Sequence, residues 1–405
     1  MSDSKDGLLN AYRASASAEM EGARALPFSV YTDGRIYELE LRRLFEEGWV
    51  FVCAAAEIPE PGDYCAFFLA EEPVLVVRGE DGRLRAMSNA CRHRGTVLGD
   101  IGFGRAARFV CPYHAWSYDT RGILDRVPHS RGTAVEREAH RLTSFALEEW
   151  WGLVFVNVSG DAEPLAPLLS GIEPYLELFG AGNFSHASGG APEAWEANWK
   201  VAMENAMESY HLFRVHTRTL EPVTPTREAY YVEGSAAWSV TGGKMTGTPV
   251  GYGASGASGG AGGAGGAGGE AERTPERMTW DNYLLISLPP NFVGVLTYGS
   301  LDWVSTLPAG PERCHVRMAG ISAYSGDPGV VPAGLAEAFL AEDKVICERV
   351  QRGMRARRSA GGKLVEMERV VVDFHNYLAW RLFGDPPRAP HRTPMVREFL
   401  GEGSE

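Results

Sequence analysis

The stretches CRHRG at 91–95 and CPYHAW at 111–116 decide the fold of the N-terminal half of this chain. Each stretch carries one cysteine and one histidine at close spacing, Cys91 with His93 and Cys111 with His114. Thiolates and imidazoles bind zinc and iron–sulfur clusters, so each pair predicts one half of a metal site. Both pairs lie at turns between β-rich runs, which indicates a metal centre on the loops of a β domain.

Two kinds of centre use two cysteines and two histidines. A zinc finger binds one ion with all four ligands and continues into a helix, but no finger helix follows either pair here. In a Rieske [2Fe–2S] centre, two cysteines bind one iron and two histidines bind the other. The motif, CxH with a glycine two residues later and then CPYHxW, resembles the Rieske domain of ring-hydroxylating oxygenases. The resemblance implies a [2Fe–2S] cluster held by four residues: Cys91, His93, Cys111 and His114.

The composition is that of a globular protein with more than one domain. At 405 residues the chain exceeds the size at which one hydrophobic core usually stops growing, and 44% of its residues are hydrophobic. A net charge of -13 repels phosphate backbones and anionic membranes, so we expect neither nucleic acid nor a membrane as partner. Residues 1–30 lack the apolar core of a secretory signal, and no apolar run reaches the length of a membrane helix. We therefore expect a cytoplasmic protein.

The pattern of the sequence changes near residue 160. Before this point, short β-rich runs alternate with turns such as PGD and EDGR, which predicts an all-β domain. Beyond it, amphipathic helical stretches come first, strand-like runs follow at 229–234, 282–299 and 314–325, and two more helices are expected at about 333–354 and 364–383. This pattern predicts an α+β domain. The expected division is a helical lead-in packed on the catalytic domain at 1–47, the β domain at 48–160 and the α+β domain at 161–405. The Gly- and Ala-rich tract at 251–270 predicts a flexible surface loop.

The stretch NWKVAMENAMESYHLFRVH at 198–216 predicts a helix that carries His211 and His216. Five residues separate their directions by about 140° on an ideal helix, so one histidine must lie near a distorted helix end. Two histidines and one carboxylate form the facial triad of non-haem Fe(II) oxygenases. The stretch resembles the catalytic-domain helix of Rieske oxygenases, which implies that His211 and His216 bind a mononuclear Fe(II).

The carboxylate of the triad must come from another part of the chain. The run AEDKVICERVQRG at 341–353 resembles the late acidic helix of the family, and this resemblance implies that Asp343 is the third ligand. Four further groups stay open as competitors for that role: Glu342, Glu348, Asp373 and His375.

Glu208 lies three residues before His211 and thus on the same face of the predicted helix. In the family, the acid at this position bridges the Rieske histidine of one subunit to the iron histidine of its neighbour. The resemblance therefore implies an electron path through His114, Glu208 and His211 in a head-to-tail homotrimer. The family commonly has aspartate here, and some members that oxidise quaternary ammonium compounds have glutamate. Asn205, one turn before Glu208, is expected to face the iron pocket.

The resemblance implies the fold and the overall activity. The fold is α+β, an N-terminal all-β Rieske domain followed by a helix-grip-like α+β catalytic domain with an antiparallel sheet. The chain is expected to be the oxygenase component of a mono- or dioxygenase that uses O2. Because no flavin or dinucleotide motif appears, its electrons must come from a separate ferredoxin, NAD(P)H-dependent flavin reductase or both.

Two substrate classes and one non-catalytic function stay open. Hydroxylation or N-demethylation of a quaternary ammonium compound agrees with Glu208, and four aromatic residues are candidates for cation–π contacts: Trp280, Tyr283, Tyr298 and Trp303. The alternative is hydroxylation, dihydroxylation or O-demethylation of an aromatic compound, in a pocket formed by Met203, Met207 and Phe213. A Rieske electron carrier would not need the mononuclear iron ligands, so their presence argues against that function.

Overall fold

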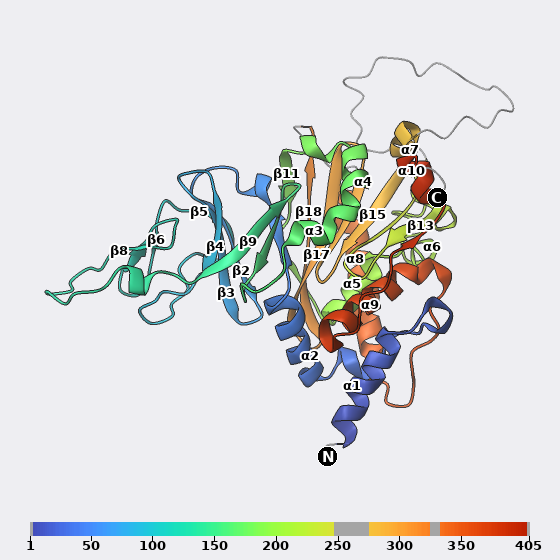
Figure 1. Cartoon of the computed structure of the whole chain (residues 1–405), viewed down its shortest axis with the longest axis horizontal. Coiled ribbons are helices and arrows are strands. Elements are labelled where there is room, and N and C mark those ends of the chain that lie inside the picture. Colours follow the sequence, from blue (N-terminus) through green and yellow to red (C-terminus); the bar gives the residue numbers. More distant parts are fainter. Residues whose placement is uncertain (1–2, 247–274, 325–332, 403–405) are drawn as a thin grey trace, which may run out of the picture.

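The structure, a computed structural model, describes residues 3–246, 275–324 and 333–402. Figure 1 shows a smaller β-rich part on the left and a larger part with a central sheet and helices on the right. The helix nearest the N-terminus, α1 (Asp3–Ala16), packs on α9 (Arg369–Phe383) near the other end of the chain. No helix in these ranges combines the length and apolar character that crossing a bilayer requires.

The smaller part is an antiparallel sheet with a short second sheet at its tip. The larger of these two sheets has the order β1 (Val50–Ala54), β10 (Leu153–Asn157), β9 (Ser144–Trp150), β4 (Leu84–Ser88), β3 (Glu72–Arg78), β2 (Asp63–Leu69) and β5 (Gly102–Arg105). The tip sheet has the order β6 (Phe109–Val110), β7 (Ser117–Tyr118) and β8 (Leu124–Arg126). Both pairs of candidate cluster ligands belong to the loops at this tip.

The larger part is built on a nine-stranded antiparallel sheet. Its order is β11 (His186–Gly189), β18 (Arg313–Ser322), β17 (Ser300–Gly310), β16 (Phe292–Thr297), β15 (Asn282–Leu288), β14 (Ser239–Lys244), β13 (Ala229–Gly234) and β19 (His391–Arg392), and β12 (Glu193–Trp195) also pairs with β18. Successive side chains of a strand point to opposite faces. Thus Tyr283 and Leu285 join one core cluster, whereas Leu284 and Ile286 join the other.

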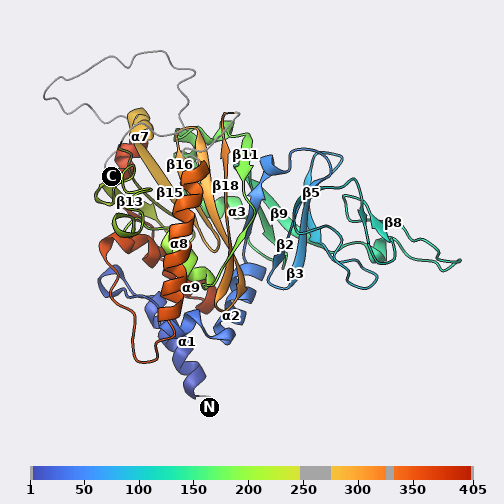
Figure 2. The ribbon, with the colours of Figure 1, turned by 180° about the vertical axis from the view of Figure 1, so that it is seen from behind.

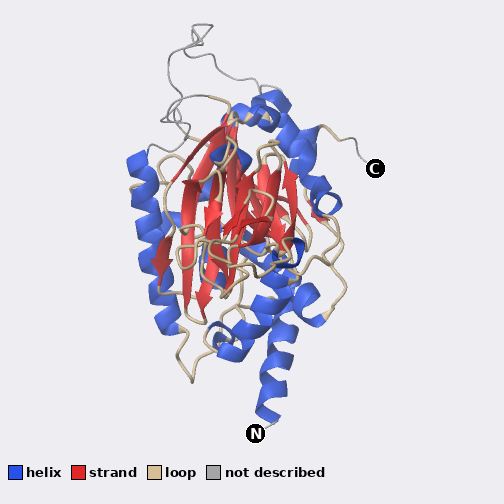
Figure 3. Ribbon diagram, turned by 90° about the vertical axis from the view of Figure 1, so that its left-hand side faces the viewer, coloured by secondary structure: helices blue, strands red, loops and turns tan. Residues whose placement is uncertain are grey.

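Helices cover both faces of this sheet (Figures 2 and 3). One face packs against α5 (Trp199–Ala206) and α9, with α8 (Ala333–Gly353) packed on α5. The opposite face packs against α3 (Leu165–Leu169), α4 (Glu173–Leu178) and α10 (Met395–Leu400). The remaining helices are α2 (Gly34–Glu40), α6 (Leu212–Val215) and α7 (Pro275–Asp281), the π-helical turn η3 (Leu41–Glu46), and the 3-10 turns η1 (Met20–Gly22), η2 (Phe28–Tyr31), η4 (Ala55–Glu57), η5 (Glu138–His140), η6 (Ser170–Ile172), η7 (Ala181–Asn183), η8 (Thr226–Glu228) and η9 (Glu366–Glu368).

The predicted fold class is confirmed: a β-rich Rieske part precedes a mixed α+β part with an antiparallel sheet. The strand predicted at AYYVEG is β13, and the run predicted at 282–299 folds as the hairpin of β15 and β16. The helix predicted at 333–354 is α8. The Gly-rich tract at 251–270, predicted to be a flexible loop, lies outside the described residues.

The helix predicted over 198–216 is only partly correct. The structure contains α5, which ends at Ala206, then a turn, and then the single turn of α6. His211 is the residue before α6 and His216 is the residue after it. On a continuous helix the two imidazoles would point in different directions, and the break in the helix brings them together. The helix distortion that was predicted near one histidine therefore affects both.

Candidate active site and cluster-binding loops

The two loops that carry the Cys-His pairs have the same backbone hydrogen bonds. Cys91 N–H donates to the carbonyl of Thr96, and Cys111 N–H donates to the carbonyl of Trp116, each at 2.8 Å. The N–H groups of Gly95 and Ala115 donate back to the two cysteine carbonyls, at 2.8 and 2.9 Å. Gly95 and Ala115 both have positive φ, 75° and 54°, and that conformation is strained for alanine. Two loops with the same backbone conformation therefore carry the two Cys-His pairs.

The four side chains fit a buried cluster. Cys91 and Cys111 are each 2% exposed, and the two histidine rings lie 4.7 Å apart. The Nδ1 atoms of His93 and His114 are buried without a hydrogen-bond partner, a state that costs free energy unless another group binds them. The ring of Trp116 stacks on His93 at 4.6 Å and fixes its orientation. The two orphaned Nδ1 atoms have the chemistry that iron ligands need.

The pairing of these four groups agrees with a two-iron cluster. The thiols of Cys91 and Cys111 interact with each other, and the ring of His93 lies against that of His114. In a Rieske centre, two cysteines bind one iron and two histidines bind the other, which matches this arrangement.

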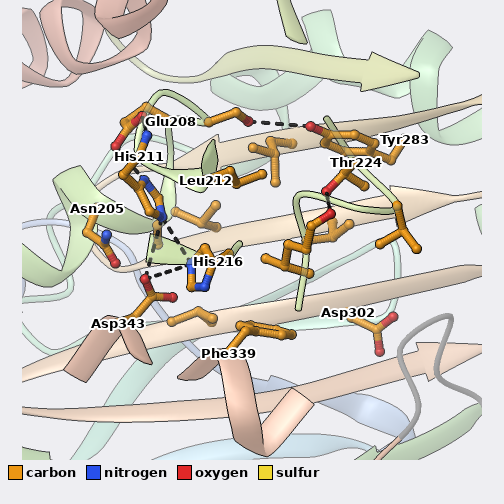
Figure 4. Close-up of a pocket in the computed structure, with 18 of the residues that line it drawn as sticks. Asn205, Glu208, His211, Leu212, His216, Thr224, Tyr283, Asp302, Phe339 and Asp343 are labelled. Atoms are coloured by element: carbon orange, nitrogen blue, oxygen red, sulfur yellow. Dashed lines mark hydrogen bonds and ion pairs between the residues drawn. The ribbon is translucent and has the colours of Figure 1, made fainter. Parts of the chain in front are cut away.

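The second constellation lies in the α+β part, between the helices and the large sheet (Figure 4). His211 Nε2 and His216 Nε2 are 3.2 Å apart. Oδ1 of Asp343, on α8, lies 3.0 Å from the nitrogen of His216 and 3.5 Å from that of His211. With metal–ligand bonds of about 2.1 Å, two neighbouring corners of an octahedron are about 3 Å apart. The three atoms therefore resemble one face of an octahedron, as a facial triad requires.

The electrostatics of this group favour a cation at its centre. Burial lowers the pKa of His211, but the carboxylates of Asp343 and Glu208 outweigh burial and raise that pKa to about 10. The pKa of His216 is raised by the same balance, with Asp343 as the main partner. Burial raises the pKa of Asp343, yet its hydrogen bonds to both imidazoles outweigh burial and lower it. The negative charge around the two rings suits a divalent metal ion as well as protons.

Each histidine is oriented by a carboxylate on its other ring nitrogen. Glu208 Oε1 lies 2.6 Å from Nδ1 of His211, and Glu342 Oε2 lies 2.8 Å from Nδ1 of His216. Glu342 also accepts a hydrogen bond from Thr219 at 2.7 Å. Such contacts fix the tautomer and the ring orientation of metal-binding histidines. The sequence interpretation named Glu342 only as a competing ligand and missed this orienting contact.

The other competitors of Asp343 lie elsewhere. Glu348 accepts a hydrogen bond from the backbone of Glu196, and Asp373 accepts one from the hydroxyl of Tyr231. His375 pairs with Glu204 at 3.0 Å. Each of these groups therefore has a structural partner outside the triad.

Glu208 is not on a helix, in contrast to the prediction. It lies in the turn between α5 and α6, where one oxygen accepts from the backbone N–H groups of Tyr210 and His211 and the other contacts the imidazole. Glu208 and His211 are therefore in contact, as expected, but a turn closed by the Glu208 carboxylate brings them together and not a shared helix face. Sequence periodicity could not reveal this because it assumed an unbroken helix.

A cavity of about 160 Å³ opens beside the triad. A cavity of about 150 Å³ holds one benzene molecule in another protein, so this space is large enough for one ring or a small ammonium compound. The lining includes Asn205, as predicted, together with Tyr283. Trp303 borders the cavity, but its ring packs against Phe51 in the core on the opposite face of the sheet. Most of the other lining side chains are apolar: Ala206, Leu212, Leu220, Val223, Met245, Leu285, Val293, Val295, Val304, Met318, Leu335 and Phe339.

Several residues expected at the pocket lie outside its lining. Met203 and Met207 are fully buried in the core, whereas Phe213 is 52% exposed. Trp280 and Tyr298 stack on each other with ring centres 4.2 Å apart, away from the described lining. Helical spacing could not show this, because it does not tell which side of a broken helix faces the sheet.

The comparisons with known proteins agree with both constellations. The model of the Rieske [2Fe-2S] domain matches residues 48–145, and the model of the ring hydroxylating alpha subunit (catalytic domain) matches residues 184–384. The chain therefore belongs to the Rieske non-haem iron oxygenases, as the sequence resemblance implied. The cofactors of this domain pair are a Rieske [2Fe–2S] cluster and a mononuclear iron, also as expected.

Individual relatives fall into two substrate groups. The chain is 34% identical over 209 residues to the glycine betaine monooxygenase oxygenase subunit of Chromohalobacter salexigens, covering 51% of this chain and 47% of that one. It is also 34% identical over 211 residues to the large oxygenase component of salicylate 5-hydroxylase from a Ralstonia species, covering 49% and 50%. The chain thus spans about half the length of the curated relatives it matches.

The same two groups appear among solved structures. The quaternary ammonium Rieske monooxygenase CntA superposes with a TM-score of 0.72 at 21% identity, over 91% of this chain and 97% of that one. Naphthalene 1,2-dioxygenase superposes with a TM-score of 0.70 at 18% identity, over 92% and 94%. These likenesses establish a shared fold across both domains.

Proposed function

We propose that this chain is the oxygenase component of a Rieske non-haem iron oxygenase system. Such a system uses O2 and electrons from a separate NAD(P)H-dependent reductase to hydroxylate or N-demethylate a small organic substrate. The observation that carries the proposal is the convergence of three ligand atoms, from His211, His216 and Asp343, at the end of a small apolar cavity. An electron carrier would have no use for such a site.

We propose that His211, His216 and Asp343 bind the mononuclear iron, which supplies the activation of O2 when bound. The protein's own contribution is to hold these ligands on one face of the metal through Glu208 and Glu342. The apolar cavity walls exclude water and hold the substrate beside the open face. Asn205 lines the same cavity and supplies a polar contact there.

We propose that Glu208 connects the iron site with the cluster of a neighbouring copy. It holds His211 on one side, and Tyr210 and Phe213 beside it are 41% and 52% exposed. On the tip of the Rieske part, Tyr113 is 59% exposed next to a candidate cluster ligand. A head-to-tail homotrimer would cover both surfaces and place His114 of the partner subunit against Glu208. The path would then run from the partner's cluster through Glu208 to His211.

The favoured substrate is a quaternary ammonium compound. The glycine betaine and CntA relatives support this class, and Tyr283 in the lining can make a cation–π contact. An aromatic compound is the second candidate, which the salicylate 5-hydroxylase relative supports. The cavity volume accommodates one ring of this kind.

The organisation and partners follow from the same proposal. The division into 1–47, 48–160 and 161–405 is supported by the packing of α1 on α9 and by the two matched domains. A ferredoxin or flavin reductase supplies the electrons as a separate protein. A cytoplasmic location agrees with the four cysteines outside the cluster loops, Cys53, Cys65, Cys314 and Cys347, which are buried and form no disulfide.

Metal content and a single turnover test the proposal. The purified protein should contain three irons per chain, two in the cluster and one in the triad, whereas a carrier would contain two. The protein is then reduced chemically, freed of reductant and mixed with O2 and panels of trimethylammonium compounds and aromatic acids. Formaldehyde or a demethylated amine establishes the first substrate class, and a phenol, diol or catechol establishes the second. Two irons per chain and no product from any panel would refute the oxygenase function.

A further inference from the structure

The Rieske part and the α+β part of the chain share an apolar core and two sets of polar contacts. In the first set, Asn291, in the turn between β15 and β16, bonds to the backbone of Phe51 on β1. Its Nδ2 donates to the Phe51 carbonyl at 2.9 Å, and its Oδ1 accepts from the Phe51 N–H at 3.0 Å. The ring of Phe51 packs against Phe292 and Trp303 of the large sheet. This contact joins the two parts at one place, and one place alone leaves a rotation about it open.

The second set centres on Arg317 of β18. Its guanidinium forms a two-pronged ion pair with Glu57 of η4, in which Nη2 contacts Oε1 and Nη1 lies 3.3 Å from Oε2. Its Nε donates to the carbonyl of Gly190 at 2.9 Å. The guanidinium also lies 4.7 Å from the ring centre of Phe103 on β5. A Cβ atom at Gly189 would come within 2.7 Å of Nη2, so this glycine leaves room for the ion pair.

The two Rieske elements that Arg317 contacts lie at opposite ends of the Rieske sheet. The turn η4 directly follows β1, the first strand in the sheet order, and β5 is the last strand. In the chain, β5 also follows the loop 91–95 that carries the first Cys-His pair. One arginine therefore connects both edges of that sheet, and the strand after a cluster loop, to the large sheet.

Arg317 does not reach the iron cavity. Its neighbour Met318 lines the cavity, so the alternation of β18 turns Arg317 to the opposite face of the sheet. Arg317 is 9% exposed, and the side chain of Glu57 is 7% exposed. A buried arginine–carboxylate fork has a specific geometry, whereas apolar contacts are non-directional. The ion pair can therefore fix an angle that the shared apolar core leaves open.

We propose that Arg317 is a positioning residue for electron transfer, because it holds the Rieske part, and with it the cluster, at a fixed angle to the α+β part of the same chain. This inference rests on the proposed electron path between copies. Figure 1 shows the tip with β6 and β8 at the far end of the Rieske part from β18. A small rotation at Arg317 therefore moves the tip further than it moves the contact itself. A misplacement of about 1 Å far from the reacting groups can slow a reaction about a hundredfold.

The angle can be measured without substrate in the iron-loaded, full-length protein. A nitroxide is attached to Ala338→Cys, an exposed position of α8, and pulsed EPR measures its distances to the chemically reduced, paramagnetic cluster. The native cysteines are buried, so the label reacts with the introduced thiol. The wild type should give narrow distance distributions.

The main variant is Arg317→Met/Glu57→Gln, which removes both charges so that neither is left buried without its partner. It should broaden or shift the distance distributions. Arg317→Lys keeps the positive charge but loses the fork, so its distributions should lie between those of the wild type and the double variant. Phe103→Leu removes the ring contact and leaves the ion pair intact, and it should cause a smaller change in the same direction.

Single-turnover kinetics test the effect on electron transfer. The probe substrate is glycine betaine or, if that is not oxidised, the compound from the panels that is. The double variant should slow the oxidation of the reduced cluster by O2 about tenfold to a hundredfold. Its iron content, visible spectrum and rate of cluster reduction by dithionite should stay unchanged. A merely structural role of Arg317 would not slow the first rate and spare these three properties.

The matched control is Arg392→Met. Arg392 pairs with Glu233 at 2.8 Å near the other edge of the same large sheet, and it also pairs with Glu402. Both partners belong to the α+β part, so this variant breaks an arginine ion pair on the sheet without altering the contact between the two parts. It should match the wild type in the distances and in the rate of cluster oxidation.

Three outcomes would overturn the inference. These are unchanged distances in the double variant, an equal change in Arg392→Met, and changed distances with an unchanged rate of cluster oxidation. The proposed function fails separately. If the distances change but no panel compound is oxidised in a single turnover, the orienting role stands and the oxygenase assignment falls. If a compound is oxidised equally fast by the wild type and the double variant, the oxygenase stands and this inference falls.

Discussion

Removing the charge of Glu40 should destabilise the protein more than almost any other single polar change. Glu40 is 0% exposed and accepts hydrogen bonds from Lys200 at 2.7 Å, from Tyr12 at 2.8 Å and from Trp199 at 2.9 Å. Lys200 is also 0% exposed, and burial lowers its pKa although Glu40 opposes the shift. Because α5 begins with Trp199 and Lys200, this ion pair joins the lead-in segment to the helix that precedes the iron site.

The expected cost follows from leaving Lys200 buried without its counter-charge. Breaking one side of a buried ion pair typically costs about 3–5 kcal/mol, a large part of the about 5–15 kcal/mol that stabilises a folded domain. Replacing both partners with neutral residues removes the uncompensated charge. The double variant Glu40→Gln/Lys200→Met should therefore lose several kcal/mol less than the sum of the two single variants.

Urea unfolding is the assay, with tryptophan fluorescence reporting both parts of the chain and the visible absorbance of the cluster reporting the Rieske part. Glu40→Gln should lower the fluorescence midpoint. The matched control is Glu47→Gln, which breaks the exposed pair of Arg43 and Glu47 in the same lead-in segment and should cost less than about 1 kcal/mol. Equal losses in Glu40→Gln and Glu47→Gln, or additive losses in the double variant, would refute the reasoning.

Three further predictions concern the iron site, and a fourth concerns a buried carboxyl group away from it. His211→Ala should lose the mononuclear iron and keep the visible spectrum of the cluster, so iron analysis should fall from three to two per chain, and an unchanged count would contradict the ligand assignment. Glu208→Gln should keep all three irons yet slow the oxidation of the reduced cluster by O2 with substrate bound, as followed by stopped-flow absorbance; an unchanged rate would exclude the bridging role. Glu342→Gln removes the carboxylate that orients His216 and should weaken iron binding about 10- to 100-fold in a chelator competition, without affecting the cluster. Burial raises the pKa of Asp373 to about 7, above its ordinary value in the unfolded chain, so the folded state holds this proton more tightly and loses stability as the pH rises from about 4 through 7. Asp373→Asn should therefore gain stability relative to the wild type at pH 8 and not at pH 4 in urea unfolding; a gain that is independent of pH would show that Asp373 does not titrate in this way.

The sequence predicted much of the fold because its signals are local. The strand-like runs became β13, β15, β16 and β18, and the helical pattern at 364–383 became the turn η9 followed by α9, which begins at Arg369 and ends before Gly384, whose φ is 72°. A glycine in this left-handed conformation is a strong helix stop that can be identified from sequence. The division of the chain into a β-rich part and an α+β part could be predicted for the same reason, because local sequence patterns distinguish strands from helices.

The prediction failed where tertiary contacts decided the local structure. The stretch at 198–216 has helical spacing, yet the chain breaks after Ala206 and Glu208 closes the turn with its own carboxylate. The pocket expected around Met203 and Met207 was wrong, because those side chains point into the core shared with the sheet and with α9. Hydrophobic periodicity identifies an apolar face but not the element that covers it.

The sequence by itself determined the chemistry of the two metal sites. Ligand types and short spacings within 91–95 and 111–116 are fixed by covalent neighbours, so the cluster loops and their cofactor could be recognised without coordinates. Only the tertiary structure brought Asp343 of α8 to within 3.0 Å of His216 and formed the cavity beside them. Asp343 is more than 120 positions away from both histidines in the chain. Contacts over such separations depend on how the sheet and helices pack, and that packing decides which substrate the site accepts.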